Sequence, residues 1–265
     1  MDIFGLIGLF LAVALCVYGI ISGGGDIMAF INYPSLLIVL GGTIGSLMIA
    51  TPFETIRNVP KHLKIVFSKS PYIPQEYIVQ IVELAKVARR NGLLALEEKA
   101  NDISDEFLKG SIMLIVDAIE PDRVQRILET QIDYIQQRHD EVTAFYDQAA
   151  ALGPAFGMLG TVIGLINMLG DLSLADPEVL GVGMALALIT TLYGSFLANV
   201  LFSPISAKLN AIGNQEMLCL RLSMEGIISI QAGENPKHIE SKLMSYLPAE
   251  MQTVMDNAAN EQRGV

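Results

Sequence analysis

The sequence predicts an all-α integral membrane protein with four transmembrane helices and a large helical cytoplasmic region between the second and third. Composition is the first sign, because 52% of the 265 residues are hydrophobic and only 17% are charged, against about 25% in an average soluble domain. The second sign is a set of charge-free stretches, each longer than the roughly 20 residues that cross a hydrocarbon core as a helix. They cover residues 3–25, 27–53, 149–170 and 179–207.

The basic residues, the third sign, define how these spans are oriented. All 17 Lys and Arg lie either between Arg57 and Arg138 or between Lys208 and Arg263, and the short connections 22–33 and 170–180 have none. Because Lys and Arg collect on the cytoplasmic side of a membrane, both termini and the large central segment are expected in the cytoplasm. We place the four spans near residues 3–21, 34–51, 150–169 and 181–203.

The spans divide the chain into four segments. Residues 1–52 hold transmembrane helices 1 and 2, and residues 53–149 form a helical cytoplasmic domain. Residues 150–204 hold transmembrane helices 3 and 4, and residues 205–265 form cytoplasmic helices and a tail.

Apolar residues in the cytoplasmic segments recur at helical spacing. One helix is expected to begin at Pro74 and to end at Gly92. Another starts at Pro121, and because nothing breaks its pattern before the third span, we expect one continuous rod that enters the membrane. The remaining predicted helices cover LLALEEKAND, residues 106–119, 207–230 and 236–246.

Several classes of function are disfavoured by the polar residues. The net charge of −11 contains no concentrated basic patch, so nucleic-acid binding is not expected. His62, His139 and His238 are far apart without neighbouring ligands; we expect them to be solvated and to form no metal site. The sequence has no Ser with a nearby His and no paired carboxylates that would suggest a catalytic centre. We therefore predict neither an enzyme nor a bound cofactor.

The spans carry no Asp, Glu, Lys or Arg. Carriers and pumps place ionisable residues within the membrane to bind the ion that moves. If this protein helps to move an ion, another chain therefore has to supply the carboxylate.

The third span instead offers small residues and a hydroxyl. Gly153, Gly157, Gly160 and Gly164 form overlapping small-xxx-small pairs that let helices approach closely in lipid. Thr161 lies in this span, and Thr190 and Thr191 lie in the fourth. A membrane Thr commonly bonds back to the carbonyl of residue i−4, so both this role and an ion-binding role stay open.

Prolines and surface charges also have two interpretations each. Pro154 is either a tolerated first-turn proline or a kink or hinge, and Pro204 is by default a helix-end signal. A cluster of four charges in the central segment is either a solvated face or a contact surface. It consists of Arg89, Arg90, Glu97 and Glu98.

Three stretches carry a resemblance to a known family. LGPAFGMLGTVIGLINML and MALALITTLYGSFLANVLFSPISAKL look like helices 3 and 4 of flagellar motor stator A subunits, the MotA/PomA family, and AKVARRNGLLALEEKA matches the loop between helices 2 and 3. The resemblance covers nearly the whole chain. TolQ/ExbB subunits, which energise a periplasmic partner, are more distantly similar and have three spans; that function is the alternative, and a passive scaffold is a third possibility.

The resemblance implies a rotary machine of the bacterial inner membrane. In the family, a ring of A subunits, five in number, surrounds a pair of B subunits (MotB/PomB-like). Each B subunit contributes one transmembrane helix with an essential aspartate. Influx of Na⁺ or H⁺ drives the ring, which pushes on the rotor switch protein FliG. No cofactor beyond the transported ion is implied.

The resemblance also assigns roles to individual residues. Pro154 and Pro204 match the prolines that couple ion flow to movement, and Thr161 and Thr191, with Thr190 beside them, match hydroxyls near the ion path. Thr at position 161 is similar to sodium-driven members, so sodium is preferred over protons. Arg90 and Glu98, with neighbours Arg89 and Glu97, match the rotor contacts, whereas Ala100 departs from an acidic residue found in some members.

Overall fold

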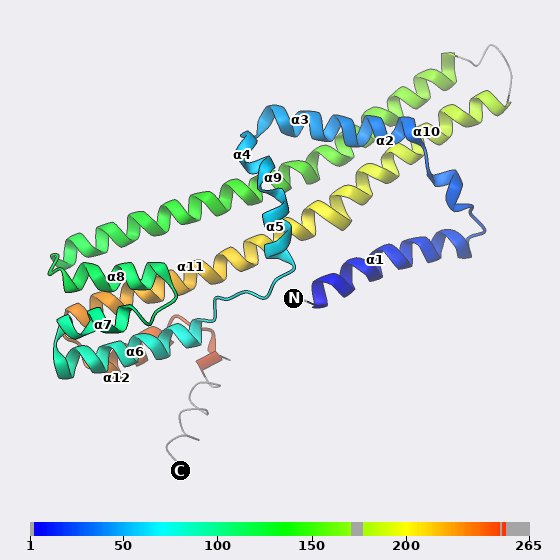
Figure 1. Cartoon of the computed structure of the whole chain (residues 1–265). Coiled ribbons are helices and arrows are strands. Elements are labelled where there is room, and N and C mark those ends of the chain that lie inside the picture. Colours follow the sequence, from blue (N-terminus) through cyan, green and yellow to red (C-terminus); the bar gives the residue numbers. More distant parts are fainter. Residues whose placement is uncertain (1–2, 171–176, 250, 253–265) are drawn as a thin grey trace. The chain divides into compact units, whose positions relative to one another are not determined.

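The computed structural model describes residues 3–170, 177–249 and 251–252, and within these ranges the chain forms helices and no strands (Figure 1). Among the described residues, four helices are long and apolar enough to cross a membrane, as predicted. The chain divides into two compact units. The first comprises the residues up to Lys69 together with His139–Ala211, and the second comprises Ser70–Arg138 together with the residues from Ile212 onward.

The first unit begins with the two N-terminal spans. α1 (Ile3–Ser22) has no buried side chain among those described. The second span is a continuous helical run of α2 (Tyr33–Leu36), a π-helical turn η2 (Leu37–Gly41) and α3 (Gly42–Ala50). The short 3₁₀ turn η1 (Ile27–Phe30) precedes it, and α4 (Phe53–Arg57) and α5 (Val59–Val66) follow it.

Local sequence explains where the second span begins. Asn32 caps the helix by accepting a hydrogen bond from the Ser35 backbone N–H at 3.0 Å, and Pro34 occupies its first turn. The Tyr193 hydroxyl also accepts a hydrogen bond from the Asn32 N–H at 3.2 Å. This contact ties the start of the second span to the fourth.

α9 (Pro121–Gly170) is a single helix of 50 residues. This confirms the prediction of one continuous helix from Pro121 through the third span. The helix continues because nothing interrupts the helical spacing of its apolar residues. Pro154 therefore lies in the interior of a helix, and its interpretation as a first-turn residue is wrong.

The fourth span also continues beyond its predicted end. α10 (Pro177–Phe196) passes through a π-helical turn η5 (Leu197–Phe202) into α11 (Ser203–Gln231) without a break. The expectation that Pro204 ends the helix is therefore wrong. In the π turn the Ser203 N–H bonds to the Ala198 carbonyl, five residues back. This change of register just before Pro204 accommodates a residue that lacks an N–H.

α9 and α10 pack closely in the membrane unit (Figure 1). A Cβ atom at Gly164 would lie 2.7 Å from both the Ala187 backbone nitrogen and the Gly183 carbonyl oxygen. At Gly157 it would lie 2.9 Å from the Thr190 carbonyl oxygen, and at Gly153 3.0 Å from that of Gly194 on α10. The partner of this glycine face is therefore the next span of the same chain. The buried glycines on this face of α9 are Gly153, Gly157, Gly160 and Gly164.

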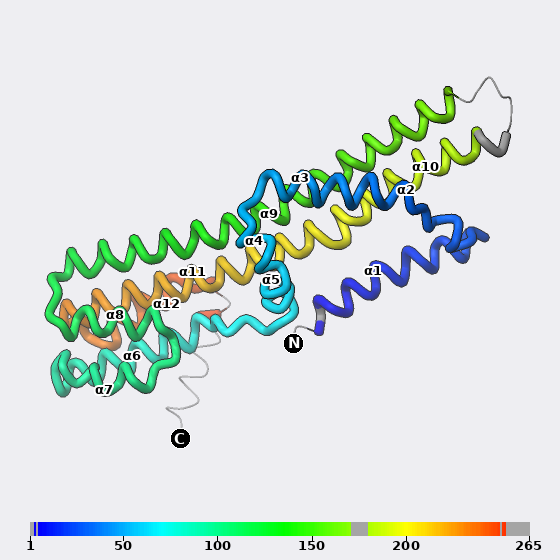
Figure 2. Tube along the Cα trace, turned by 45° about the horizontal axis from the view of Figure 1, so that its top comes forward, coloured from blue at the N-terminus to red at the C-terminus, as the bar shows by residue number. Residues whose placement is uncertain are grey.

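The helices of the second unit lie side by side (Figure 2), and their buried apolar side chains form one hydrophobic core. α6 (Pro74–Asn91) ends at Gly92, whose φ of 84° favours glycine, as predicted. The 3₁₀ turn η3 (Leu93–Ala95) and α7 (Leu96–Ala100) follow. α8 (Glu106–Val116) and α12 (Pro236–Met244) end a few residues earlier than expected. Core residues include Ile78, Ile81, Leu96, Leu108, Ile112, Leu128, Leu222, Ile227 and Ile239.

His62 departs from the sequence expectation. It is buried, and its Nδ1 lies 3.4 Å from the Tyr146 hydroxyl, so the prediction that all three histidines are solvated is wrong here. Burial, and to a smaller extent Lys61, lowers the pKa of His62. Val59, His62 and Val66 lie on one face of α5. This helical spacing is the sequence signal that could have predicted the burial of His62.

We predict that Gly164→Ala destabilises the protein by about 1–3 kcal/mol, because its methyl group would enter the space of the α10 backbone, which cannot move aside as a flexible side chain could. Gly45→Ala is the matched control: it also lies in a membrane helix, but nothing stands within 4 Å of its Cβ position. Thermal unfolding of the detergent-purified protein measures both. Equal melting temperatures for the two variants would contradict the packing role of Gly164.

Candidate functional site

The α9–α10 contact brings two hydroxyl groups together. The Oγ1 atoms of Thr161 and Thr191 lie 2.5 Å apart, close enough for one hydroxyl to donate to the other. The Ala187 carbonyl oxygen is 3.0 Å from Thr161 Oγ1 and 3.2 Å from Thr191 Oγ1. Thr191 is exposed and Thr161 is half-buried. We call this group of three oxygen atoms the hydroxyl pair with its carbonyl.

Thr190 lies in a different environment from its neighbour. It is fully buried, and its hydroxyl is 2.9 Å from the Leu186 carbonyl oxygen and 3.0 Å from that of Ala187. Its side chain fills the space beside Gly160. The structure therefore brings Thr161 and Thr191 together, whereas Thr190 occupies the helix-packing side.

The hydroxyl pair also makes local backbone contacts. Thr161 Oγ1 is 3.1 Å from the Gly157 carbonyl oxygen, and Ala187 is itself four residues before Thr191. Both threonines thus make the i−4 bond expected of a membrane Thr. Each hydroxyl donates its one proton to one of these contacts, and its oxygen keeps lone pairs that can accept a hydrogen bond or bind a cation. Part of this oxygen group lies on an exposed face. Such neutral oxygens suit a hard cation, but the spans supply no negative charge of their own.

The two candidate coupling prolines lie at separate levels of the membrane unit. Pro154 is exposed, and a Cβ atom at Gly194 would lie 3.1 Å from its Cα. Pro204, also exposed, is ten residues after Gly194 in the same continuous helical run, which is about 15 Å of helix. Each removes one N–H from a helix that otherwise continues.

The four candidate contact charges surround one corner of the second unit. Arg89 and Arg90 are in the last turn of α6, and Glu97 and Glu98 are in the first turn of α7. These positions complement the helix dipoles. All four are exposed, and none forms an ion pair with another described residue.

Two neighbouring residues refine this corner. Leu94, between the arginines and the glutamates, is 74% exposed, which gives the corner an apolar centre. Ala100 is 0% exposed and belongs to the core. In this chain a carboxylate at position 100 would be buried among apolar side chains, which is costly.

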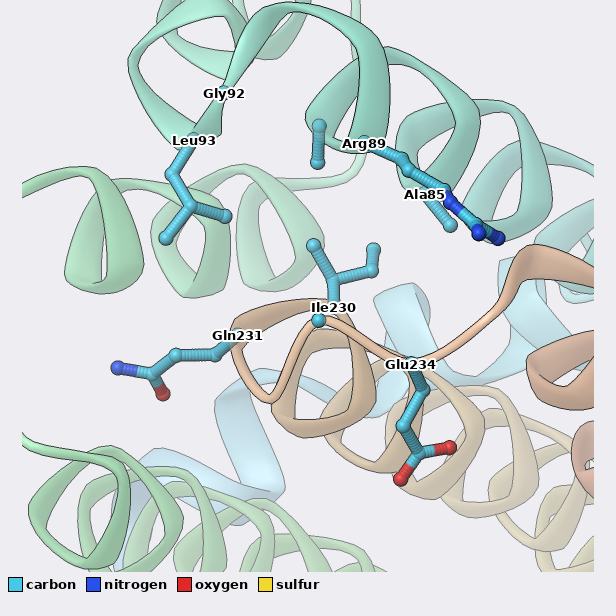
Figure 3. Close-up of a pocket in the computed structure, with 9 residues that line it drawn as sticks. Ala85, Arg89, Gly92, Leu93, Ile230, Gln231 and Glu234 are labelled. Atoms are coloured by element: carbon cyan, nitrogen blue, oxygen red, sulfur yellow. The ribbon is translucent and has the colours of Figure 1, made fainter.

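A hollow of about 170 Å³ opens beside this corner (Figure 3). The end of α6, including Arg89, lines one side, and the end of α11 with the following turn lines the other. Sequence reasoning missed Gln231 and Glu234, which belong to this second side. Gly233 and Pro236 mark a helix end at this point of the sequence, and this was the only available signal. Gln231 and Glu234 are too far from Arg89 in the sequence for any residue spacing to predict that they lie near it. Among the described residues, no group of three or more His, Cys, Asp or Glu could hold a metal ion.

Comparison with known proteins gives two family matches that together span most of the chain. Residues 6–92 match the Motility protein A N-terminal model, and residues 99–221 match the MotA/TolQ/ExbB proton channel family. The chain is 38% identical to Motility protein A of Borreliella burgdorferi, over 82% of this chain and 83% of that relative. It is 37% identical to the chemotaxis protein PomA of Vibrio alginolyticus, over 93% and 96% of the two chains.

A solved structure extends the match to three dimensions. The flagellar MotAB stator complex of Bacillus subtilis contains a chain that is 34% identical and aligns with a TM-score of 0.86, over 94% of this chain and 98% of that one. The N-terminal match and the four spans both distinguish this chain from the three-span subunits considered as an alternative. The chain therefore belongs to the MotA/PomA family of motility proteins.

Proposed function

We propose that this chain is the A subunit of a flagellar motor stator, a channel component that couples the influx of Na⁺ or H⁺ to torque on the rotor. The observation that carries the proposal is the match over nearly the full chain to a MotAB stator complex. Restoration of swimming in cells that lack their own stator A subunit tests it directly. A TolQ/ExbB-like energiser would instead act on a periplasmic partner and would leave such cells non-motile.

A B subunit of the MotB/PomB type completes the ion path in this proposal. The spans offer hydroxyl and carbonyl oxygens but no carboxylate, so a membrane aspartate of the partner supplies the charge that holds the ion. An elementary charge that crosses 100 mV releases about 2.3 kcal/mol. The A subunit converts this energy into movement.

Several copies, five by the family pattern, form the ring around the B subunits. Exposed apolar side chains of α1, α9 and α10 support an assembly in which lipid and neighbouring subunits cover them. The protein lies in the inner membrane with both termini in the cytoplasm, which the distribution of Lys and Arg supports. Pro154 and Pro204 are then the points at which the two continuous helices deform most easily, because each proline removes one backbone hydrogen bond.

The transported ion passes the hydroxyl pair, and sodium is the preferred ion. A partly dehydrated Na⁺ needs several oxygen ligands, whereas a proton needs only the partner's carboxylate and water. The Thr161 and Thr191 hydroxyls and the Ala187 carbonyl provide three oxygen atoms, and no two of them are more than 3.2 Å apart. Thr190 would act indirectly, by filling the space beside Gly160 and so fixing the position of the pair.

The rotor protein FliG is the partner of the charged corner. Exposed charges that have no partner within the described chain steer an encounter and allow rapid release, as a stepping contact requires. Arg89, Arg90, Glu97 and Glu98 meet this description.

We predict that Arg90→Glu and Glu98→Lys each reduce swimming severely while the protein reaches the membrane in normal amounts. Lys86→Glu is the matched control: it reverses an exposed charge on α6 whose i,i+3 pair with Glu83 contributes little. Swimming speed and membrane content are measured for all three. Compensating charge reversals on the rotor should restore part of the lost speed. Normal swimming of both variants would refute the rotor contact.

We predict that swimming speed at fixed pH rises with external sodium, and that Thr161→Ala shifts the half-maximal sodium concentration upward by about tenfold, the effect of losing about 1.4 kcal/mol of binding. Ser46→Ala removes a hydroxyl from the second span and serves as the control. A speed that does not respond to sodium would favour protons. An unchanged sodium response of Thr161→Ala would remove Thr161 from the ion path.

A further inference from the structure

α4 and α5 follow the second span at the edge of the membrane. The span rises about 27 Å from Tyr33 to Ala50, which nearly matches the roughly 30 Å of a hydrocarbon core. α4 begins only three residues later, at Phe53. The chain therefore enters α4 and α5 in the layer where lipid headgroups meet water.

The contact of α5 with α9 places it at the same level. His62 Nδ1 lies 3.4 Å from the hydroxyl of Tyr146, which is four residues, or about 6 Å of helix, before the third span begins near residue 150. Figures 1 and 2 show α5 running across the direction of α9. α5 thus lies along the membrane surface instead of crossing it.

The face of α5 opposite to His62 is exposed and basic. It carries Lys61, Lys64 and Ile65, all of them exposed. Side chains three and four residues apart are neighbours on a helix, so Lys64 and Ile65 both adjoin Lys61. We call Lys61 and Lys64 the basic face of α5.

Further positive charges flank this basic face, and no acidic side chain balances it. Between residues 51 and 70 the only carboxylate is that of Glu54. The four basic side chains of this stretch are exposed, and none forms an ion pair with a described residue. A group of this kind directly after a membrane span is typical of contact with anionic lipid. The residues are Arg57, Lys61, Lys64 and Lys69.

Exposed apolar side chains beside these charges favour a lipid over a soluble anion. Phe53, the first residue of α4, is 72% exposed, and Ile65, next to Lys61, is 45% exposed. Phe and Leu-like side chains of interfacial helices enter the boundary between headgroups and acyl chains. A free phosphate or an acidic peptide would contact the lysines and leave Phe53 in water.

We propose that α5 binds the headgroups of anionic phospholipids in the leaflet where the second span ends. The Lys61 and Lys64 ammonium groups donate hydrogen bonds to headgroup phosphate oxygens, and Phe53 lies among the acyl chains. Because the opposite face of α5 packs on Tyr146 of α9, bound lipid stabilises the place where the third span leaves the membrane. The inference goes beyond the stator function and depends on neither the rotor contact nor the transported ion.

Thermal unfolding of the full-length chain in neutral detergent tests the inference. A ligand that binds only the folded state raises the melting temperature once its concentration exceeds the dissociation constant. We expect phosphatidylglycerol, an anionic lipid, to raise it, and phosphatidylcholine, which has no net charge, to have little effect. Glycerol phosphate and inorganic phosphate carry charge without acyl chains and should have little effect as well.

Paired substitutions locate the site. Lys61→Gln with Lys64→Gln should raise the half-maximal phosphatidylglycerol concentration about tenfold or more, because each basic residue near an anionic surface adds to the attraction. Lys61→Arg with Lys64→Arg keeps both charges and should keep the response. The matched control, Lys86→Gln with Lys237→Gln, removes two exposed charges from the second unit and should leave the response unchanged.

Three results would overturn the inference. Equal responses to the two lipids would show that the headgroup charge is not recognised. A response to free phosphate as large as that to phosphatidylglycerol would assign the basic face to a soluble anion. An unchanged lipid response of the Lys61→Gln, Lys64→Gln variant would remove the basic face from the site, and a change in that variant's oligomeric size would then assign the face to a second copy of the chain. If this variant does not fold, Lys64→Gln alone and the comparison of the two lipids on the unaltered chain decide.

Discussion

The close approach of α9 and α10 is the contact on which the membrane unit depends. At Gly153, Gly157 and Gly164 the two backbones are so near that a methyl group would touch main-chain atoms of the opposite helix. Lipid tails are as apolar as these helices, so close packing and interhelical hydrogen bonds must hold the pair together. The same approach brings Thr161 Oγ1 to 2.5 Å from Thr191 Oγ1. Packing and candidate ion chemistry are therefore consequences of one geometry.

That geometry provides dipoles without net charge. Hydroxyls and carbonyls can replace part of an ion's hydration, but they cannot compensate its charge in hydrocarbon, where an unpaired charge is costly. A chain that meets only the first requirement depends on a partner for the second. The membrane unit is therefore chemically incomplete for ion binding within the single chain.

The sequence was sufficient wherever one local rule decided the outcome. Gly92 at positive φ ends α6, the uninterrupted pattern after Pro121 gives one helix, and small residues mark the close face of α9. It was insufficient where a distant contact decided. Pro204 reads as a helix end, yet a π turn carries the helix past it. His62 reads as solvated until Tyr146, 84 residues away, covers it. For the same reason no spacing could join Arg89 to Glu234.

The continuity of the helices limits how movement can pass along this chain in the proposed function. No loop interrupts α10, η5 and α11, so a displacement at Thr191 must travel through a π turn and past Pro204. A π turn holds its residues by i→i+5 bonds, and a return to α-helical bonding shifts the following residues around the axis. Proline leaves one carbonyl without its helical donor, which lowers the cost of such a shift. Coupling by a change of helical register at η5 thus requires less rearrangement than a hinge, because the rod never has to break.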